Sequence, residues 1–377
     1  MSNIWSTIHD DDLNYLDKTV GFLQGEFCPE GMDPIWSSQY FKWKLGSSNP
    51  AGKGYLSLAL MDNKVVGSVS ITKKRLLIDG CEYIGGEIGD SYSSAAVRRR
   101  CRPEKLSELN LNPKSYINKS VFGRLATEIR ARAEQDGVNI IYGTPNNKAY
   151  PGWIKRLDYF DFKNSEIRSY SRPTTKFIIG KFPFLSYIRL ILRGMEISTI
   201  GLYKIFYEQI KCRGLRFEVG IPTEIELNNL WKKLKPQKGF SLVRDALYWR
   251  HRYFEHPLVK YIFFKIIKNE KVIGVVVTRM HYIGTNKKVV SISEWMLNEK
   301  INFGYVLSNI VFYFKRDDID VFNLWLSASD SEAKKTGINY FFSKRRIPII
   351  LSNTSQSKKI ENISSHIDFY LGCSDAI

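Results

Sequence analysis

The fold is decided by the stretch NPAGKGYLSLALMDNKVVGSVSIT at positions 49–72, because the chain uses this pattern twice. The second copy reads HPLVKYIFFKIIKNEKVIGVVVT and occupies positions 256–278. In both copies a proline lies 17 positions before a glycine, at Pro50 with Gly67 and at Pro257 with Gly274. The period is about 207 residues, far above the roughly 20–50 residues of a solenoid repeat, so we expect two related domains in tandem.

Each copy has the pattern of a β-hairpin. In the first copy the apolar run 55–61 leads into a turn at Asp62-Asn63, and a second apolar run follows at 64–72. A basic patch that contains tryptophan precedes each copy, YFKWK at 40–44 and YWRHR at 248–252. One supersecondary unit, together with its preceding patch, is therefore expected in each half of the chain.

The remaining pattern alternates between strand and helix. Strands are expected over 76–88 and 138–143, and between them the apolar spacing of Val121, Leu125, Ile129 and Ala133 predicts a helix that ends at 136–137. In the second half, Thr223 to Glu226 has the spacing of a capping box. Further elements are expected there as strands at 289–297 and 321–327 and a helix at 303–314. The pattern predicts an α/β protein with mixed (α+β) sheets.

The composition favours a folded protein with two cores. The chain has 377 residues, of which 44% are hydrophobic and 14% aromatic. Its five cysteines have no C-x-x-C or zinc-binding spacing, which indicates reduced thiols in a cytoplasmic protein. The N-terminus lacks a signal-peptide pattern, and no run of 18 apolar residues occurs, so we expect no membrane-spanning segment.

The formal net charge of +18 predicts an anionic partner or reflects a generally basic surface. Nucleic acid, an anionic membrane face and phosphorylated small molecules are the classes of partner that fit. Residues 168–216 contain ten Lys/Arg and two Glu. We expect 166–216 to be a basic helical linker packed between domains at 1–165 and 217–377, with peripheral membrane contact by 182–212 as the alternative.

Three stretches of the first half carry a resemblance to a known family. They read GGEIGDSYS at 85–93, NKSVFGRL at 118–125 and YGTPNNKAYPGW at 142–153. Their order of hairpin, central strand, loop, helix and splayed strand resembles the GNAT acyltransferases. With the tandem repeat, the chain is similar to the two-domain bacterial GNAT N-acyltransferases that modify nucleotide-linked amino-deoxysugars for lipopolysaccharide O-antigen and capsule. The resemblance implies two tandem GNAT-like domains, the second degenerate because it lacks the loop.

The resemblance also implies an activity. An acyl group would pass from acyl-coenzyme A to the amino group of a nucleotide-linked amino-deoxysugar by direct attack in a ternary complex. Relatives of this kind include enzymes that act on dTDP-3-amino-3,6-dideoxygalactose, and acetyl and 3-hydroxybutanoyl both stay open as the acyl group. The expected partners are acyl-coenzyme A and the sugar nucleotide, and neither a metal nor nucleic acid is expected.

A coenzyme A diphosphate requires backbone N–H groups at a helix N-terminus and small residues that let the phosphates approach. This loop departs from the usual Arg/Gln-x-x-Gly-x-Gly/Ala pattern, because Ser120 and Phe122 occupy glycine positions. Arginine forks at 98–100 suit phosphate oxygens. The resemblance implies that coenzyme A is bound by Ser91, Tyr92, Ser93, Arg98, Lys119, Ser120, Val121, Phe122, Gly123, Arg124, Asn146 and Asn147.

The expected central strand carries two carboxylates, Glu87 and Asp90, that are candidates for the base. Residues three positions apart point to opposite faces of an ideal strand, so at most one need face the site. Asp90 is preferred because it lies nearer the strand end where pantetheine should enter, and Tyr150 is the candidate acid for the leaving thiolate. The acceptor is expected to contact Arg99, Trp249, Arg279, His281, Glu294 and Trp295.

Two further functions fit the sequence. A Fem-like aminoacyltransferase also pairs two GNAT-like domains and takes its acyl group from charged tRNA, which would account for the basic charge. A non-catalytic protein on a GNAT scaffold would bind nucleic acid or a membrane surface, with a steep dependence on salt. Copurifying tRNA would favour the first of these, and salt-dependent binding without thioester turnover would favour the second.

Overall fold

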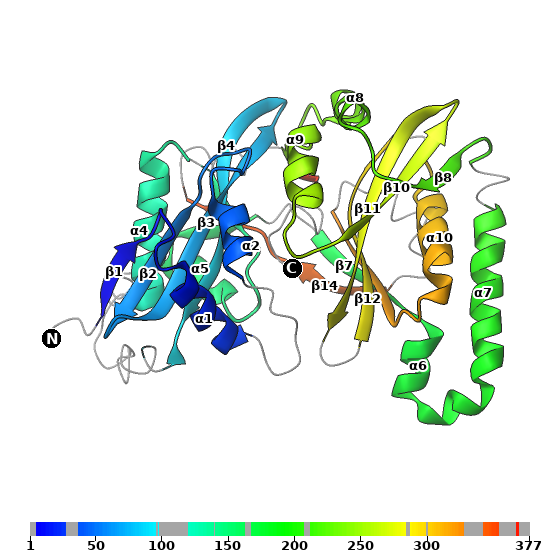
Figure 1. The fold of residues 1–377 in the computed structure, drawn as a ribbon, viewed down its shortest axis with the longest axis horizontal. Coiled ribbons are helices and arrows are strands. Elements are labelled where there is room, and N and C mark those ends of the chain that lie inside the picture. Colours follow the sequence, from blue (N-terminus) through cyan, green and yellow to red (C-terminus); the bar gives the residue numbers. More distant parts are fainter. Residues whose placement is uncertain are drawn as a thin grey trace.

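The computed structural model describes residues 5–27, 37–95, 97, 120–138, 140–162, 167–206, 212–283, 287–298, 301–327, 342–353 and 367–368. It has two mixed sheets, one beside the other, with helices on the faces of each (Figure 1). The fold is thus α/β with two sheet domains, as the repeat predicts. We call the space between the two sheets the seam.

The first sheet is built around the first hairpin. Its main strand order is β1-β2-β3-β4-β5-β15-β6, and β9 and β16 extend it beside β3. Helix α4 (Val121–Gln135) covers one face, while α1 (Leu16–Phe27) and α2 (Ser38–Leu45) cover the other. The strands are β1 (Ser6–His9), β2 (Tyr55–Met61), β3 (Lys64–Ile78), β4 (Cys81–Ser93), β5 (Ile141–Gly143), β6 (Tyr159–Asp161), β9 (Phe240–Leu242), β15 (Ile350–Ser352) and β16 (Ile367–Asp368).

The second sheet repeats this plan around the second hairpin. Its strand order is β14-β7-β13-β12-β11-β10-β8. Helix α10 (Phe303–Tyr313) covers the face away from the seam, while α8 (Glu224–Leu234) and α9 (Ala246–Trp249) lie on the seam side (Figure 1). The strands are β7 (Ile167–Pro173), β8 (Arg216–Val219), β10 (Tyr261–Lys268), β11 (Lys271–Ile283), β12 (Lys287–Leu297), β13 (Val321–Leu326) and β14 (Phe342–Ile347).

Both hairpin turns have the backbone that the sequence predicts. Asp62 and Asn63 have φ of +50° and +59°, and Asn269 and Glu270 have +49° and +59°. Two successive residues with positive φ make a turn whose twist matches that of the flanking strands. The expected capping box is also present, because the Thr223 side chain accepts from the Glu226 amide and the Glu226 side chain accepts from the Thr223 amide.

The two halves of the chain exchange strands, so boundaries at 165 and 217 do not separate two self-contained sheets. β7 lies inside the expected linker 166–216, yet it pairs with β13 and β14 in the second sheet. β15 returns from the far end of the chain and lies between β5 and β6 in the first sheet. Ile350 and Leu351 of β15 are fully buried there. The burial of these side chains stabilises a pairing between strands that lie far apart in the sequence. Local sequence patterns do not reveal this pairing.

The rest of the expected linker forms an arm on the outer side of the second domain instead of a bridge between the domains. The arm consists of α6 (Thr175–Lys181), a 3-10 segment (Pro183–Ile188) and α7 (Arg189–Phe206). In Figure 1 it lies on the side of the second domain away from the first. One buried residue, Ile200, joins α7 to the core that contains Val311 of α10.

The two copies of the basic patch meet at the seam. The Trp43 indole stacks on the His251 ring, with a centroid separation of 4.7 Å and an interplanar angle of 9°. Trp43 Nε1 donates to the His251 carbonyl at 2.9 Å, and His251 Nε2 lies 3.1 Å from the Trp43 carbonyl oxygen. Because the two residues hold equivalent places in their patches, the contact is reciprocal, as in the interface of a twofold dimer.

Candidate active site at the domain seam

Strand β4 contains an irregularity at Asp90. Ser70 of β3 pairs with Gly89 and Ser68 pairs with Tyr92, so two residues of β4 lie opposite one residue of β3. Asp90 has φ +47°, which is costly for a residue other than glycine. An inserted residue of this kind is a β-bulge, which breaks the alternation of side chains along the strand.

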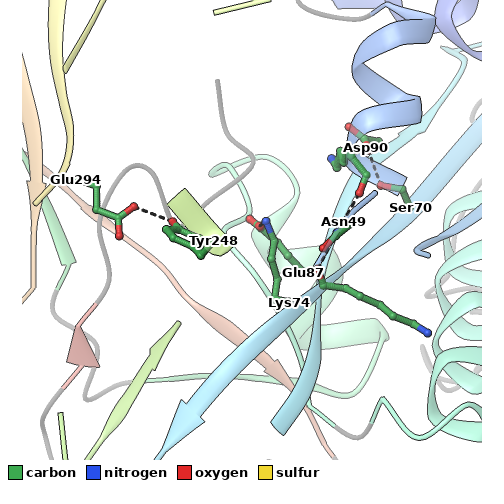
Figure 2. A network of polar contacts seen from close by, with 9 residues as sticks. Asn49, Ser70, Lys74, Glu87, Asp90, Tyr248 and Glu294 are labelled. Carbon is green, nitrogen blue, oxygen red and sulfur yellow. Dashed lines mark hydrogen bonds and ion pairs between the residues drawn. The ribbon is translucent and has the colours of Figure 1, made fainter. Parts of the chain in front are cut away.

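Because of the bulge, Glu87 and Asp90 face the same side of the sheet, and not opposite sides as ideal alternation predicts. Glu87 pairs with Thr72, and the Asp90 carboxylate accepts from the Ser70 hydroxyl, two positions away on the same face of β3. This face looks toward the seam (Figure 2). Two carboxylates therefore share one side of the central strand.

Asp90 is held in a buried ion pair. Lys44 Nζ of α2 donates to Asp90 Oδ2 at 2.9 Å, and the two side chains are only 3% and 9% exposed. Asn49 supports this arrangement, because its Nδ2 donates to the carbonyls of Lys44 and Lys73 at 3.2 and 3.1 Å. The pair ties the end of α2 to the bulge, so the geometry favours a positioning role for Asp90 over the role of base.

Glu87 is engaged by a different lysine. Its Oε2 lies 3.3 Å from Lys74 Nζ, and the Glu87 side chain is buried. Lys74 lines a cleft at the seam, and so does Lys44, the partner of Asp90; neither carboxylate is itself among the lining residues. Each carboxylate is therefore linked to the cleft through its lysine partner.

The seam cleft is formed by both halves of the chain. It comprises about 470 Å³ of space, which includes open solvent. Figure 2 shows Lys74 and Tyr248, which approach it from opposite sides. The cationic side chains among its lining residues are Lys44, Lys73, Lys74, Arg75 and Arg252, and the aromatic ones are Trp43, Tyr248 and His251.

On the side of the first sheet that α4 covers, strands β4 and β5 separate from each other. They pair only at Gly86 and Glu87, and beyond Glu87 the structure describes no strand against that edge of β4. Helix α4 begins beside the gap, with Ser120 as its N-cap and the Ser120 hydroxyl accepting from the Gly123 amide at 3.0 Å. The amides of Val121 and Phe122 have no hydrogen-bond partner among the described residues. An open strand edge and free first-turn amides suit an extended anionic ligand.

Several residues expected to bind coenzyme A have other contacts here. Asn146 Oδ1 accepts from the amides of Lys148 and Ala149 in the turn before α5 (Tyr150–Arg156), and Asn147 is exposed. The Tyr92 hydroxyl donates to Glu26 of α1, away from the gap.

The remaining expected ligands of coenzyme A lie near the gap or outside the described residues. Ser91 is half-buried and Ser93 pairs with Gly67. The Phe122 ring packs edge-on against Trp153, and Arg124 Nε donates to Glu128 at 2.7 Å. Arg98, Arg99 and Lys119 lie outside the described residues.

Tyr150, the expected acid, lies at the start of α5. Burial, followed by the charge and hydrogen bond of Asp161, raises its pKa above the ordinary value. Arg346 of β14 binds the same carboxylate through two contacts of 3.1 and 3.2 Å. Tyr150 therefore stays protonated at neutral pH, and its described hydrogen bond is directed toward Asp161.

The residues of the second domain that were expected to contact the acceptor are mostly buried. Trp249 and Trp295 are 0% and 4% exposed and pack in the hydrophobic cores, so neither has a free face for a substrate. Glu294 accepts hydrogen bonds from Tyr248, at 2.7 Å, and from Tyr253. Burial raises the pKa of Glu294. Trp249 packs in the core on the seam side, Trp295 packs against Phe303 of α10 on the other face of the sheet, and none of the three residues lines the cleft.

Arg279 and His281 lie on β11, near the seam. Arg279 is buried, and its Nε has no hydrogen-bond partner among the described residues. Burial lowers the pKa of Arg279, with neighbouring Arg252 acting in the same direction. Burial and then Arg279 lower the pKa of His281 to about 4, so this imidazole is neutral at pH 7. In the described part of the chain, no group of three His, Cys, Asp or Glu side chains is placed to hold a metal.

The sequence did not identify Lys44 and Lys74 as partners of the two carboxylates. Lys44 belongs to the YFKWK patch, so the repeat did mark its neighbourhood. Lys74 lies on the extension of β3 beyond the repeated stretch, where nothing in the sequence connects it to Glu87.

Comparison with known proteins gives relatives by structure only. No protein-family model matches the chain, and no curated protein sequence does. A GCN5-related N-acetyltransferase from Anabaena variabilis superposes with TM-score 0.55 and 12% identity, covering 92% of this chain and 72% of that one. A probable N-acyltransferase from Enterococcus faecalis gives 0.56 and 10%, with the same coverage. Saccharomyces cerevisiae N-myristoyltransferase with bound myristoyl-CoA gives 0.56 and 14%, covering 94% and 83%. The chain therefore has the tandem-domain fold of GNAT acetyltransferases and N-myristoyltransferases.

Proposed function

We propose that this protein is an N-acyltransferase that moves an acyl group from an acyl-coenzyme A to an amine. The observation that carries the proposal is the opening between β4 and β5 beside the N-terminus of α4, on the strand whose two carboxylates pair with lysines that line the seam cleft. The fold shared with acyltransferases supports the same conclusion.

The two substrates would approach the central strand from different sides. The coenzyme A diphosphate would accept hydrogen bonds from the amides of Val121 and Phe122, where the helix dipole favours negative charge. The pantetheine arm would follow the open edge of β4 past Ser91 and Ser93. The amine would enter through the seam cleft, next to Lys74.

In the proposed reaction the amine nitrogen attacks the thioester carbonyl carbon. The C–N bond forms and the C–S bond breaks; the amine loses one proton and the leaving thiolate gains one, giving an amide and free coenzyme A. We assign Glu87 to orienting the amine and accepting its proton, with Lys74 holding the carboxylate. Asp90 would act indirectly, by fixing the bulge through Lys44 and Ser70.

For the acceptor we propose a nucleotide-linked amino-deoxysugar, such as dTDP-3-amino-3,6-dideoxygalactose, with acetyl or 3-hydroxybutanoyl as the acyl group. The lining of the cleft supports an anionic acceptor, because it contains five lysine or arginine residues and no aspartate or glutamate. Lysine and arginine suit a diphosphate, and Trp43, Tyr248 and His251 offer flat surfaces for a sugar or a base.

We further propose that coenzyme A binds only to the first domain. The start of the corresponding helix in the second domain has an apolar contact, since the rings of Trp295 and Phe303 pack with their centroids 4.9 Å apart. Burial of a polar diphosphate beside such side chains is costly.

The test is an assay of thiol release by the full chain. Acetyl-, 3-hydroxybutanoyl- and myristoyl-coenzyme A are each combined with an amino-deoxysugar nucleotide, a peptide with a free amino terminus and a simple polyamine. Amine-dependent thiol release, with the mass of the acylated amine detected by mass spectrometry, is the expected result. No release from any combination, with tRNA copurifying with the protein, would replace this proposal with the aminoacyl-tRNA alternative.

A further inference from the structure

Helix α7 is amphipathic with its apolar side outward. Leu190, Ile191, Met195 and Leu202 are 86%, 63%, 62% and 69% exposed. Of these, Ile191, Met195 and Leu202 recur at the spacing of one helical face. A surface helix of a water-soluble domain normally turns such residues toward the core, so this face is suited to an apolar environment outside the molecule.

Two charged side chains of α7, Glu196 and Lys204, point toward the protein. Glu196 accepts from the Thr175 amide at 3.0 Å and lies 3.7 Å from Arg172 of β7. Lys204 lies over the ring of Phe312, 5.2 Å from its centroid, next to α10. Helix α7 therefore has charged side chains, but the fold places these two on its inner side and leaves apolar side chains on its outer side.

The 3-10 segment before α7 continues the apolar surface. Phe184 and Tyr187 are 69% and 93% exposed, and Phe182 is exposed beside them. We call the exposed apolar side chains of Phe182 to Leu202 the arm surface. In Figure 1 the arm projects beyond the second sheet, so this surface is far from the seam.

The charge around the arm surface has one sign. Residues 175–206 contain five basic residues, Lys176, Lys181, Arg189, Arg193 and Lys204, and Glu196 is the single acidic residue. Glu196 and Lys204 are turned inward, and Lys176 pairs with Asp318 and Asp320. The basic charge of the outer rim therefore comes from Lys181 and Arg189. No helix in the described part of the chain is long and apolar enough to cross a membrane.

We propose that the arm surface docks the protein onto an anionic lipid bilayer. Aromatic and aliphatic side chains beside lysine and arginine are the composition of a helix that lies in the plane of a membrane interface. The apolar side chains would enter the acyl-chain boundary, and the basic rim would contact lipid phosphates. This inference is independent of the proposed acyltransferase activity.

A second copy of the chain is a less suitable occupant of the arm surface. A symmetric contact brings the same patch of both copies together, so Lys181 and Arg189 of one copy would meet a patch that carries the same basic residues. No acidic side chain on the outer side of the arm would neutralise them among the described residues. An anionic bilayer supplies the missing negative charge.

The test measures cosedimentation of the full chain with vesicles of phosphatidylcholine and phosphatidylglycerol (3:1) and with vesicles of phosphatidylcholine alone. The variant is Ile191→Ser/Met195→Ser/Leu202→Ser. The control is Val219→Ser/Ile221→Ser/Ile225→Ser, which removes three apolar side chains that are 53%, 68% and 75% exposed elsewhere on the second domain. Thermal unfolding checks that both variants stay folded.

We expect the wild-type chain and the control to bind the anionic vesicles equally, and the arm variant to bind at least about tenfold more weakly, because three inserted side chains are lost. Binding should fall as salt is raised. Equal weakening by both variants, or no preference for anionic vesicles, would overturn the proposal. So would a concentration-dependent dimer in sedimentation equilibrium that only the arm variant abolishes, because a second copy would then cover the surface.

Discussion

We expect removal of the Asp90 charge to act mainly on the free energy of unfolding, and less on proton transfer in the reaction. The Asp90→Asn substitution keeps the shape of the side chain and leaves the Lys44 ammonium, 3% exposed, without its carboxylate. Breaking a buried ion pair by removing one partner costs about 3–5 kcal/mol of the free energy of unfolding.

A second, independent calculation gives a similar loss in the free energy of unfolding. A lysine that loses its counter-charge can release its proton, which for an ordinary lysine pKa of about 10.4 costs roughly 4.6 kcal/mol at pH 7, at 1.36 kcal/mol per pH unit. The loss should therefore lie between about 3 and about 5 kcal/mol.

The assay is a double-mutant cycle by urea unfolding, with Asp90→Asn, Lys44→Met and the two together. Because the double variant leaves no unpaired charge, its loss should be smaller than the sum of the single losses by at least about 2 kcal/mol. Asp12→Asn is the matched control, because it removes the same kind of pair, with Lys53 at 2.7 Å, from an exposed position. Additive single losses, or an Asp90 variant no less stable than the Asp12 variant, would refute the reasoning.

Three further predictions concern the seam. Glu87→Gln should lower kcat by about tenfold or more, while the KM for acyl-coenzyme A stays within about twofold, since Glu87 faces the amine and not the thioester; a change in the thioester KM alone would contradict this. His281, with a folded pKa of about 4 against an ordinary 6.5, should reduce stability by up to about 3 kcal/mol as the pH falls from 6.5 to 4, because only the unfolded chain takes up its proton in that window. His281→Gln should flatten that part of the pH profile of urea unfolding, and an unchanged profile would count against the assignment. Trp43→Phe should cost about 1–2 kcal/mol in the same assay, because it removes the indole donor to His251 at the seam, and no loss would show that the reciprocal contact is not stabilising.

The repeat allowed much of the fold to be predicted, because hairpins and caps are encoded locally. The resemblance between the copies extends to single hydrogen bonds. Asn49 Oδ1 accepts from the amide of Ala51, two positions later, and His256 Nδ1 accepts from that of Leu258, also two positions later. Different side chains thus stabilise the same turn in the two domains.

The candidate site was predicted less completely, because its key features depend on contacts between distant residues. A bulge cannot be inferred from the alternation of one strand, and it places Asp90 on the same side as Glu87. The partner of Asp90 lies 46 positions earlier, on α2. The exchange of β7 and β15 between the sheets likewise follows from burial in three dimensions and leaves no local pattern.

We propose a single acyl-coenzyme A site at the N-terminus of α4, and calorimetric titration of coenzyme A into the full chain measures the number of sites and their affinity. Ser120→Asp keeps an N-cap residue but adds a negative charge next to the proposed diphosphate site. Asn302→Asp makes the matched change at the N-cap of α10 in the second domain. We expect one site per chain, at least about tenfold weaker binding in the Ser120 variant and unchanged binding in the Asn302 variant. Two sites per chain, or weakening by the Asn302 variant alone, would contradict it.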